Sequence, residues 1–541
     1  MRYLVLVFAL LAPLAAQAPA DVIKAIRAEE ATNPQVQVIL KDLVDGIGPR
    51  LTSSSQLTKA CEWARGKFAS FGIDNARLEE WGTFPVGFDR GVMTGRITAP
   101  DEMTLQFTTP SWTPGTAGPQ RGPVVAAPAS VEELDAMGAK LKGAWVLGSV
   151  KGLRGKERAD IYARLGVLGG ISSAPGDLVI TDGNSGITWE TRPTDTRIIV
   201  AASQFKAIAK QLEEGKKVEA EFDLGQKFVE GPIKLFNVLA EIRGTEKPDE
   251  IVIVGGHIDS WDGARGTTDN GTGTATTIEA ARLLMKVGAK PRRTIRFMLW
   301  SGEEQGLLGS RAYAKAHPEE NARISAVLVH DGGTNYVSGI SATAAMQPLF
   351  ERIFEPLTSM QGELKFAIRP VKSLPMGIGS DHDTYVQMGV PGFFWNQAGT
   401  ANYTRTHHTQ HDNFDAANAE YQSHTSTVVA IGALAVANLP EMLPRDELRS
   451  STEFTRGPRR ALGIQLAEEG DVLEVASVED KGVGDKAGMK AGDVIMTIGG
   501  KEVKNRFDMR QALRDGGTTQ VVGVKRAGKI VELKATFEAA K

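Results

Sequence analysis

The side chains best suited to bind a metal and activate a substrate are concentrated in the second half of the chain. All eight histidines lie at or after position 257. His257 and Asp259 follow a short apolar run, and Glu303 and Glu304 follow another. Imidazole and carboxylate groups are ordinary ligands of zinc. This pattern therefore indicates a metal site.

Three more candidates occupy comparable positions. Asp331 follows the apolar run Ile324 to Val329, and His408 lies in a loop after a further run of this kind. Asp269 comes just before a helical pattern. In open α/β sheets, ligands bind outside the carboxyl ends of the strands. We therefore expect these side chains to converge at one edge of a sheet.

A charge count favours two metal ions over one. Asp269, Glu304 and Asp331 carry negative charge, whereas His257 and His408 are neutral when they bind a metal. Two divalent cations and one hydroxide balance this set, but a single cation would leave crowded carboxylates without compensation. Two ions about 3.5–4 Å apart that share one carboxylate satisfy the set better.

Each of these residues alone has an ordinary structural explanation. A lone histidine at a strand end is usually structural, and two glutamates that open a helix usually complement its dipole. Their combination at successive strand ends makes coincidence improbable. Within the set, Glu303 suits general-base work on an attacking water. Asp259, two residues past His257 on an extended segment, would share its face and orient its imidazole.

Alternating strands and helices are expected to position these residues. Buried strands are predicted at 251–254, 295–300, 324–329 and 390–395, with a helix at 272–287. This alternation predicts an α/β fold with a mixed, mostly parallel sheet sandwiched by helices.

The chain divides by texture into five regions. They are a signal peptide (1–20), the N-terminal part of the catalytic domain (21–121), a β-rich inserted domain (122–228), the rest of the catalytic domain (229–446) and a small β-rich domain (447–541). The segment Thr108 to Pro123, dense in Pro, Gly and Thr, predicts a linker. In the insert, strands are expected at 122–127, 143–150 and 196–202, and helices at 158–165 and 203–214. In the last region, strands are expected at 462–467, 472–478, 493–498 and 520–526, and a helix at 506–514.

The N-terminus has the layout of a secretory signal peptide. Arg2 precedes the apolar run Tyr3 to Leu14, and Ala18-Pro19-Ala20 supplies small residues before a cut at Asp21. The run is too short for a comfortable membrane span. We therefore expect export to the periplasm or the outside of the cell, and no membrane span after cleavage.

Composition excludes some classes of partner. The 62 basic and 65 acidic residues give a net charge of -3, which leaves no electrostatic footprint for nucleic acid. Cys61 is the single cysteine, so no intramolecular disulfide can form. It lies on one helical stripe with Leu57, Ala64 and Phe68, which predicts a buried structural thiol.

Five short motifs surround the candidate ligands: Gly255 to Trp261, Thr268 to Gly273, Trp300 to Ser310, Ser380 to Asp383 and His408 to Asp412. Together they resemble the zinc exopeptidases of metallopeptidase family 28. The resemblance covers about residues 30 to 440 and includes Gly48-Pro49-Arg50-Leu51. The insert at 122–228 resembles a protease-associated domain.

The resemblance implies a role for each residue. His257 and Asp331 would hold one zinc ion, Glu304 and His408 a second one, and Asp269 would bridge them. Glu303 would be the base. His407 stands where the family often has Tyr, and His408 is taken as the ligand because its spacing to Asp412 matches the family. The remaining polar residues of these motifs would face the substrate or support the ligands; they are Ser380, Asp381, His382, His407 and His411.

The C-terminal region resembles a PDZ domain. Leu462, Gly463 and Ile464 would form the loop whose backbone N–H groups receive a peptide's terminal carboxylate, and the following strand would accept the peptide by β-addition. A β domain that only packs against the catalytic region is the alternative.

These observations predict an exopeptidase with two Zn²⁺ ions per chain that hydrolyses short peptides or dipeptides, of the aminopeptidase or dipeptidase type. A carboxypeptidase of the glutamate carboxypeptidase type is the first alternative. An acyl transferase similar to glutaminyl cyclases and a metal-free binding protein are alternatives from other classes. Cobalt or manganese in place of zinc and a homodimer are left open.

Overall fold

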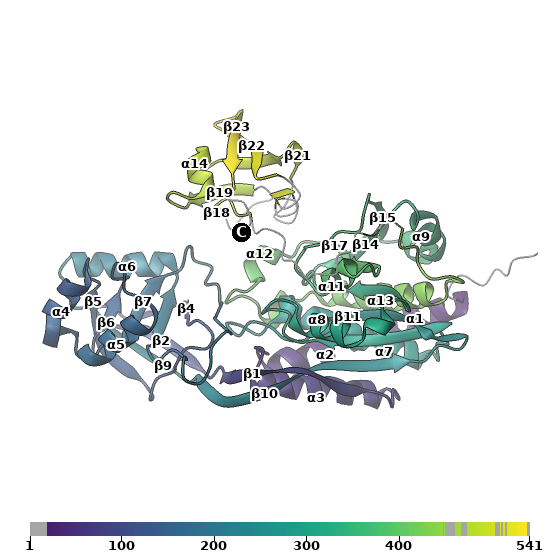
Figure 1. Ribbon diagram of the computed structural model, residues 1–541, viewed down its shortest axis with the longest axis horizontal. Coiled ribbons are helices and arrows are strands. Elements are labelled where there is room, and N and C mark those ends of the chain that lie inside the picture. The colour runs from purple at the N-terminus through teal and green to yellow at the C-terminus, as the bar shows by residue number, and fades with distance from the viewer. Residues whose placement is uncertain are drawn as a thin grey trace, which may run out of the picture. The chain divides into compact units, whose positions relative to one another are not determined.

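The computed structural model describes residues 19–446, 448, 460–466, 473–503, 509, 512–513 and 517–537 (Figure 1). The chain forms two compact units, which divide between Thr452 and Glu453. Nearly all of the predicted signal peptide, with its run Tyr3 to Leu14, lies outside the described residues, as does most of the helix predicted at 506–514.

A six-stranded mixed sheet forms the centre of the first unit, in the order β1–β10–β12–β11–β13–β16. The last four of these strands run parallel to one another, whereas β1 and β10 pair in antiparallel fashion. The strands are β1 (Arg77–Asp89), β10 (Lys227–Ile242), β11 (Lys247–His257), β12 (Arg293–Trp300), β13 (Ile324–Val329) and β16 (Gly392–Phe394). The four strands predicted in this region correspond to β11, β12, β13 and β16, so the predicted mixed, mostly parallel sheet is confirmed.

Both faces of this sheet are covered. Val252 and Val254 of β11 belong to a core that also contains Ile278 of α7 (Thr272–Lys286). Their neighbours along the strand, such as Ile253, point the other way into a second core with Tyr313. This alternation explains why β12 and β13 are buried along their whole length, as expected of strands with helices on both faces.

Helices of the first unit flank the sheet, and α7 contacts α13, α2 and the strands β11 and β12. The predicted helix at 272–287 is α7. Cys61 is buried on α3, as predicted. The other helices outside the insert are α1 (Ala20–Thr32), α2 (Val36–Lys41), α3 (Ser55–Ser70), α8 (Leu308–Ala316), α9 (Gln347–Ile353), α10 (Glu355–Thr358), α11 (His382–Gln387), α12 (Tyr403–Thr406) and α13 (Ala419–Ala437). Short helical turns lie at η1 (Asp42–Ile47), η3 (Thr267–Gly271), η4 (Pro318–Glu320) and η5 (Phe414–Ala416), and a small sheet contains β14 (Tyr336–Ala342), β15 (Ala367–Pro370) and β17 (Asn396–Ala398).

The insert contains an eight-stranded sheet in the order β3–β2–β9–β5–β6–β7–β8–β4. Its middle strands, β5 to β8, are parallel, so the insert is an α/β layer rather than purely β-rich. The strands are β2 (Met93–Ala99), β3 (Met103–Thr104), β4 (Phe107–Thr108), β5 (Gln120–Ala126), β6 (Trp145–Leu147), β7 (Gly169–Ser173), β8 (Arg197–Val200) and β9 (Glu219–Leu224). The helices are α4 (Val131–Met137), η2 (Gly138–Leu141), α5 (Gly155–Leu165) and α6 (Ala202–Glu213).

The segment Thr108 to Pro123 connects β4 and β5 of this one sheet and does not link two regions, which corrects the prediction of a linker. Thr109, Ser111 and Trp112 are buried, and the segment runs into β5. The physical reason is that its threonines and serine bond to neighbouring loops, so their polarity does not signal contact with solvent. Three strands of the insert sheet, β2 to β4, also come before residue 122, where the sequence placed the start of the insert.

The second unit is a small β domain with its own core, in which Val475, Ile498 and Val524 are buried. Its described strands are β18 (Ile464–Leu466), β19 (Leu473–Val478), β20 (Val494–Ile498), β21 (Lys501–Glu502), β22 (Thr519–Arg526) and β23 (Lys529–Thr536), with the helix α14 (Val483–Ala487). The four predicted strands match β18, β19, β20 and β22, whereas β21 and β23 were not predicted. In the described part of this sheet, β18 pairs with β19 at one edge.

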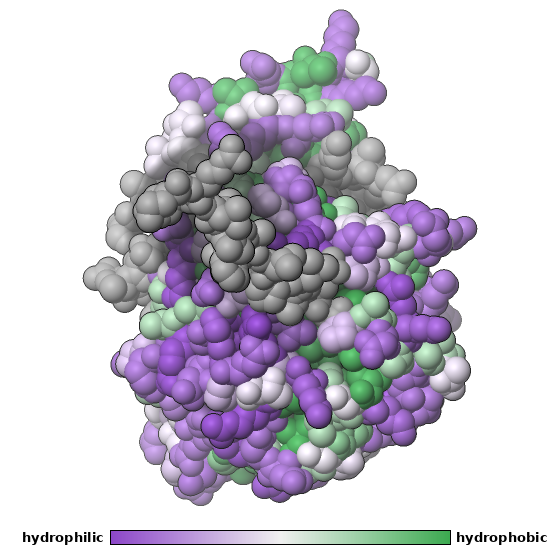
Figure 2. Space-filling model, turned by 90° about the vertical axis from the view of Figure 1, so that its right-hand side faces the viewer, coloured by the Kyte–Doolittle hydropathy of each residue, from purple (hydrophilic) through white to green (hydrophobic). Residues whose placement is uncertain are grey.

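The surface shown in Figure 2 is mostly hydrophilic, and its apolar residues lie in small groups. Among the helices that the structure describes, none has the length and apolar character needed to cross a membrane.

Candidate metal centre

Neighbouring parallel strands bring several of the predicted metal ligands to one edge of the sheet. β12, β11 and β13 lie side by side. His257 ends β11, Glu303 and Glu304 follow β12, and Asp331 follows β13. This is the edge at which open α/β sheets bind ligands. The structure thus places these side chains together, and their individual roles stay predictions.

His257 occupies the buried side of the cluster. Its imidazole is fully buried, and its Nε2 atom lies 3.0 Å from Asp331 Oδ1 and 3.1 Å from Asp269 Oδ1. Glu303 Oε2 lies 3.9 Å from the same nitrogen. One imidazole nitrogen therefore faces carboxylate oxygens from three different loops, which is a donor set that suits a divalent metal.

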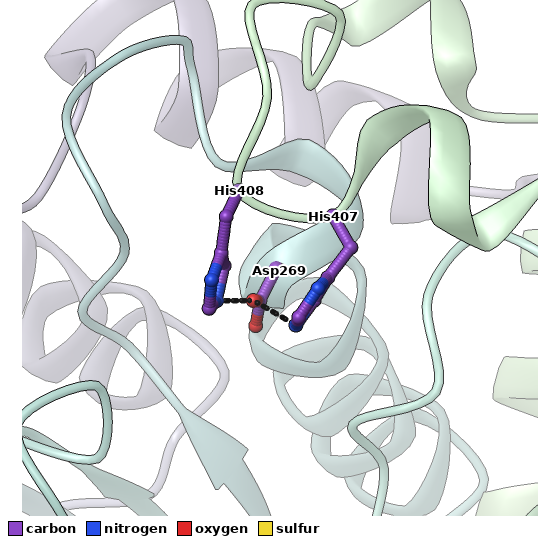
Figure 3. A group of neighbouring side chains, drawn as sticks. All are labelled: Asp269, His407 and His408. Carbon is purple, nitrogen blue, oxygen red and sulfur yellow. Dashed lines mark ion pairs between the residues drawn. The ribbon is translucent and has the colours of Figure 1, made fainter. Parts of the chain in front are cut away.

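His408 forms the other side of the cluster, and Asp269 lies between the two sides. The Nε2 atom of His408 lies 2.8 Å from Asp269 Oδ2 and 3.1 Å from Glu304 Oε2. His407 Nε2 lies 3.4 Å from the same Asp269 oxygen, and its ring stacks on His408 with centroids 3.7 Å apart (Figure 3). The two oxygens of Asp269 therefore face different histidines, Oδ1 toward His257 and Oδ2 toward His408.

The chemistry of this donor set fits divalent metal ions. Among the residues that the structure describes, two groups of three side chains have donor atoms within 4.8 Å of one another, and Asp269 belongs to both. Burial, assisted by the charge of Asp331, raises the pKa of Glu303 well above its usual value. Burial, assisted by the charge of Asp269, raises the pKa of Glu304 to about 7. Crowded, buried carboxylates of this kind lack positive charge, which divalent cations would supply.

Asp259 connects His257 to the turn that carries the two glutamates. Its carboxylate oxygens accept hydrogen bonds from the backbone N–H groups of Glu303 and Glu304, both at 3.3 Å, and from the Thr52 hydroxyl at 2.9 Å. Its backbone carbonyl oxygen lies 3.1 Å from His257 Nδ1, nearer than its carboxylate, which is 3.5 Å away. The carboxylate that sequence reasoning expected to orient His257 is thus mainly engaged with the glutamate turn.

Two buried side chains hold the loops around Asp269, and sequence reasoning assigned neither of them a role. The Arg50 guanidinium donates hydrogen bonds to the backbone carbonyls of Ile258 and Gly266, at 2.7 and 2.8 Å. The Asp412 carboxylate accepts one from the Asp269 N–H, at 3.2 Å. Both lie in motifs that carry the family resemblance, so the motifs were the available signal.

Three predicted substrate-side residues, Ser380, Asp381 and His382, lie at the start of α11 and are buried. The His382 ring packs against Phe394, with centroids 5.4 Å apart. Burial raises the pKa of Asp381 to about 7. Their burial favours support of the cluster, and contact with substrate stays a prediction. His407, by contrast, is partly exposed beside Asp269.

A small hollow of about 10 Å³, roughly the size of one water molecule, lies beside His408. Trp261 and Asp269 line it together with the loop from His408 to Asp412. Asp269 and His408 are therefore the members of the cluster that border this hollow.

The predicted carboxylate loop lies in the second unit. Leu462 is buried, Gly463 has a left-handed backbone with φ of 66°, and Ile464 begins β18. The Leu462 and Gly463 carbonyl oxygens accept hydrogen bonds from Gly484 and Glu479. These bonds fix the path of the loop, while its role in binding a carboxylate stays a prediction.

Comparisons with known proteins agree with the site. Residues 237–431 match peptidase family M28, and residues 460–536 match a PDZ domain. Carboxypeptidase Q of Mus musculus is 26% identical over 74% of this chain and 86% of its own length. A probable aminopeptidase of Saccharomyces cerevisiae is 29% identical over 37% of this chain and 56% of its own length.

A solved structure supports the same conclusion for the fold. The crystal structure of a peptidase M28 precursor from Shewanella amazonensis covers 78% of this chain and 98% of its own length, at 26% identity and a TM-score of 0.55. The matched regions include the sheet edge, the candidate ligands and the C-terminal β domain. Residues 237–431 therefore form a metallopeptidase domain of family M28, and residues 460–536 form a PDZ domain.

Proposed function

We propose that this protein is a two-zinc exopeptidase that removes end residues from short peptides, of the aminopeptidase or dipeptidase type. The observation that carries this proposal is the position of Asp269, whose two carboxylate oxygens face His257 on one side and His408 on the other. A carboxylate with one oxygen toward each of two imidazoles suits a bridge between two ions.

The donor atoms divide into two sets around this bridge. His257 and Asp331 would hold one zinc ion, and His408 and Glu304 the other. When bound, zinc would polarise the carbonyl of the scissile peptide bond and stabilise negative charge that develops on its oxygen. His407 would stand beside the second set, where its partly exposed ring can meet the substrate.

Glu303 is the residue that we assign as general base. Its carboxylate lies farther from His257 Nε2 than those of Asp269 and Asp331 do, so it is the least suited of the three to ligate an ion there. A carboxylate beside the proposed ligands that is not itself a ligand suits a group that takes a proton from the attacking water and returns it to the leaving amine. Asp259 would hold Glu303 in place through the backbone of the glutamate turn.

Carboxypeptidase action is the second candidate, because the similarity to carboxypeptidase Q extends over 86% of that enzyme. A panel of free, N-acetylated and C-amidated dipeptides distinguishes the two directions. An aminopeptidase or dipeptidase loses activity when the amine is blocked. An enzyme that loses activity only when the carboxylate is blocked is a carboxypeptidase, and that result would overturn the proposed direction.

Metal analysis separates the proposal from other classes of function. About two zinc ions per chain support the peptidase, one supports an acyl transferase similar to glutaminyl cyclases, and none supports a binding protein. All five proposed ligands are present and close together, which favours the peptidase.

The remaining regions complete the proposal. We assign residues 122–228 to a protease-associated domain and place the mature enzyme in the periplasm or outside the cell, from the pattern at residues 1–20. The PDZ domain would bind a peptide C-terminus at Leu462 to Ile464, beside the sheet edge formed by β18. A labelled peptide with a free carboxylate should bind the full chain, and its amide should bind far more weakly.

A further inference from the structure

One segment of the insert lies directly against the loop that carries His407 and His408. We call residues 177–183, between β7 and β8, the insert segment. The Thr181 N–H donates a hydrogen bond of 2.9 Å to the His408 carbonyl oxygen. Ile180 and Thr409 form an antiparallel β-bridge. A short backbone pairing thus joins the insert to the loop that carries His407 and His408, called here the histidine loop. The pairing lies immediately beside the proposed metal ligand His408.

Gln410 adds two side-chain hydrogen bonds to the same contact. Its Oε1 atom accepts one from the Val179 N–H at 2.8 Å, and its Nε2 atom donates one to the Asp177 carbonyl at 2.9 Å. The glutamine therefore binds two backbone groups of the insert segment from the histidine loop. Because Gln410 is only two residues from His408, these bonds constrain the part of the loop that sets the imidazole position.

The insert segment is itself anchored on its far side. The Thr181 side chain is buried, and its Oγ1 atom lies 2.9 Å from Thr108 Oγ1. The Asp182 carbonyl oxygen accepts a hydrogen bond of 2.8 Å from the Ser111 N–H. Gly263 packs so close that a Cβ atom there would overlap the Thr181 hydroxyl. The segment is thus held between the insert and a loop that follows β11.

His408 needs support of this kind. Its φ of 62° lies in the left-handed region, which side chains with a Cβ atom rarely adopt. Its side chain is 26% exposed, whereas His257 is fully buried. Its ring contacts Trp261 edge-on at 6.1 Å, and Trp261 in turn packs on Trp112. A disfavoured backbone on a partly buried loop keeps its geometry only when neighbouring segments hold it.

We infer that the insert segment is part of the metal centre: it positions the loop of His407 and His408 and thereby sets how tightly that side of the centre holds its metal. The expected effect on metal binding rests on the proposed two-zinc function, whereas the positioning of the loop does not depend on it. Gln410 is accordingly a positioning residue, which acts on the metal through His408.

The test compares Gln410→Ala with Gln204→Ala in the full chain. Gln204 makes the same pair of bonds within the insert alone: it accepts from the Gln106 N–H at 2.7 Å and donates to the Thr104 carbonyl at 2.9 Å. Zinc release to a chromogenic chelator is measured for both variants and the parent. We expect one portion of the zinc to leave Gln410→Ala about tenfold faster, as for other losses of a ligand's support, and Gln204→Ala to match the parent.

Amide hydrogen exchange in the metal-free protein tests the positioning of the loop by itself. Gln410→Ala should speed exchange at the Val179 and Thr181 amides, which bond to the histidine loop. Excess zinc should restore the turnover of Gln410→Ala, which it would not do for a misfolded variant. Equal zinc release and equal exchange in the two glutamine variants would overturn the inference. A parent that binds no zinc but shows the exchange difference would overturn the proposed function and leave the positioning intact.

Gly263→Ala offers a second route, because its added Cβ displaces Thr181 without touching the histidine loop directly. Gly66→Ala, on the exposed side of α3, has open space around its Cβ and serves as the control. We expect faster zinc release from Gly263→Ala only. Parent-like release from Gly263→Ala, together with parent-like exchange at Thr181, would contradict the role of the insert segment.

Discussion

The two sides of the candidate metal centre are built in different ways. On one side, His257 is the last residue of β11 and is fully buried, with Asp331 at the end of the neighbouring strand. On the other side, His408 lies on a loop, is 26% exposed, and is tied to the insert. Asp269 is common to both. One side is therefore a product of sheet topology, and the other depends on contacts between distant segments.

This difference gives the two sides different properties: the side of His257 is rigid, and the side of His408 is more accessible to solvent. A ligand at the end of a central parallel strand inherits the order of the sheet, because β12 pairs with β11 as far as His257 and β13 pairs with it as far as Gly255. A ligand on a loop can line an opening, as His408 does beside the hollow. We infer that substrate approaches from the side of His408, while the side of His257 keeps the geometry constant.

The largest expected effect separates the two neighbouring glutamates. Glu303→Gln should lower kcat by about a thousandfold or more, because it removes the general base while leaving zinc content at the parental value. Glu304→Gln is the matched variant, and it should lose zinc from the side of His408, which Glu304 contacts at 3.1 Å. Steady-state kinetics with zinc analysis of the purified variants measures both effects.

The outcome would sharpen or break the comparison between the two sides. Loss of zinc from Glu303→Gln would mean that Glu303 is a ligand on the side of His257, and the base would have to be sought elsewhere. If Glu304→Gln retains all of its zinc, Glu304 is not a metal ligand on the side of His408.

The next effect concerns stability without metal. His257→Ala should lower the free energy of unfolding by about 2–3 kcal/mol, because it removes a fully buried ring, leaves the Asp331 carboxylate without this partner and takes away one of the histidines that face Asp269. His408→Ala should cost less, about 1 kcal/mol, because the His408 ring is 26% exposed and Asp269 keeps its contact with His257. Urea unfolding in the presence of a chelator measures both. Equal losses would show that the two sides are equally rigid.

Much of the buried side could be predicted from sequence, and less of the exposed side. Apolar runs marked β11 and β13, and the rule for strand ends placed His257 and Asp331 together before any geometry was known. The insert segment carries no such signal, because its contacts with Gln410 join residues more than two hundred positions apart. The segment Thr108 to Pro123 was predicted as a linker for a related reason: the polar side chains of its buried first part bond to loops whose position only the fold determines.

A second group of crowded carboxylates tests the charge argument. Glu30 is buried beside Glu279, and burial raises its pKa from 4.5 to about 8. The folded state thus binds a proton that the unfolded state releases between these pH values, so stability falls as pH rises from about 4.5 to 8. Glu30→Gln mimics the protonated form and should add about 1–2 kcal/mol at pH 8 and little at pH 4.5.

The control for Glu30→Gln is Glu29→Gln on the same helix. The hydrogen bond from Arg282 lowers the pKa of Glu29, so its ionised form stabilises the fold above the unfolded pKa, and this variant should lose stability at pH 8. Thermal unfolding across this pH range measures both. A gain in stability at pH 8 for Glu29→Gln, or a loss for Glu30→Gln, would contradict this account. Neutralising a crowded carboxylate would then not stabilise the fold here, as cations are expected to do at the metal centre.

The smallest expected effect concerns the division between the two compact units. All the proposed ligands and the insert segment lie before residue 447, and the C-terminal unit has a separate hydrophobic core. Deleting residues 447–541 should therefore leave kcat/KM for a dipeptide within about twofold of the parent, since a dipeptide is too short to need a distant docking site. A peptide long enough to reach a PDZ groove should instead lose affinity, which appears as a higher KM at unchanged kcat. A fall in dipeptide turnover, with an unchanged circular dichroism spectrum and zinc content, would show that the exposed side of the centre depends on the PDZ domain as well as on the insert.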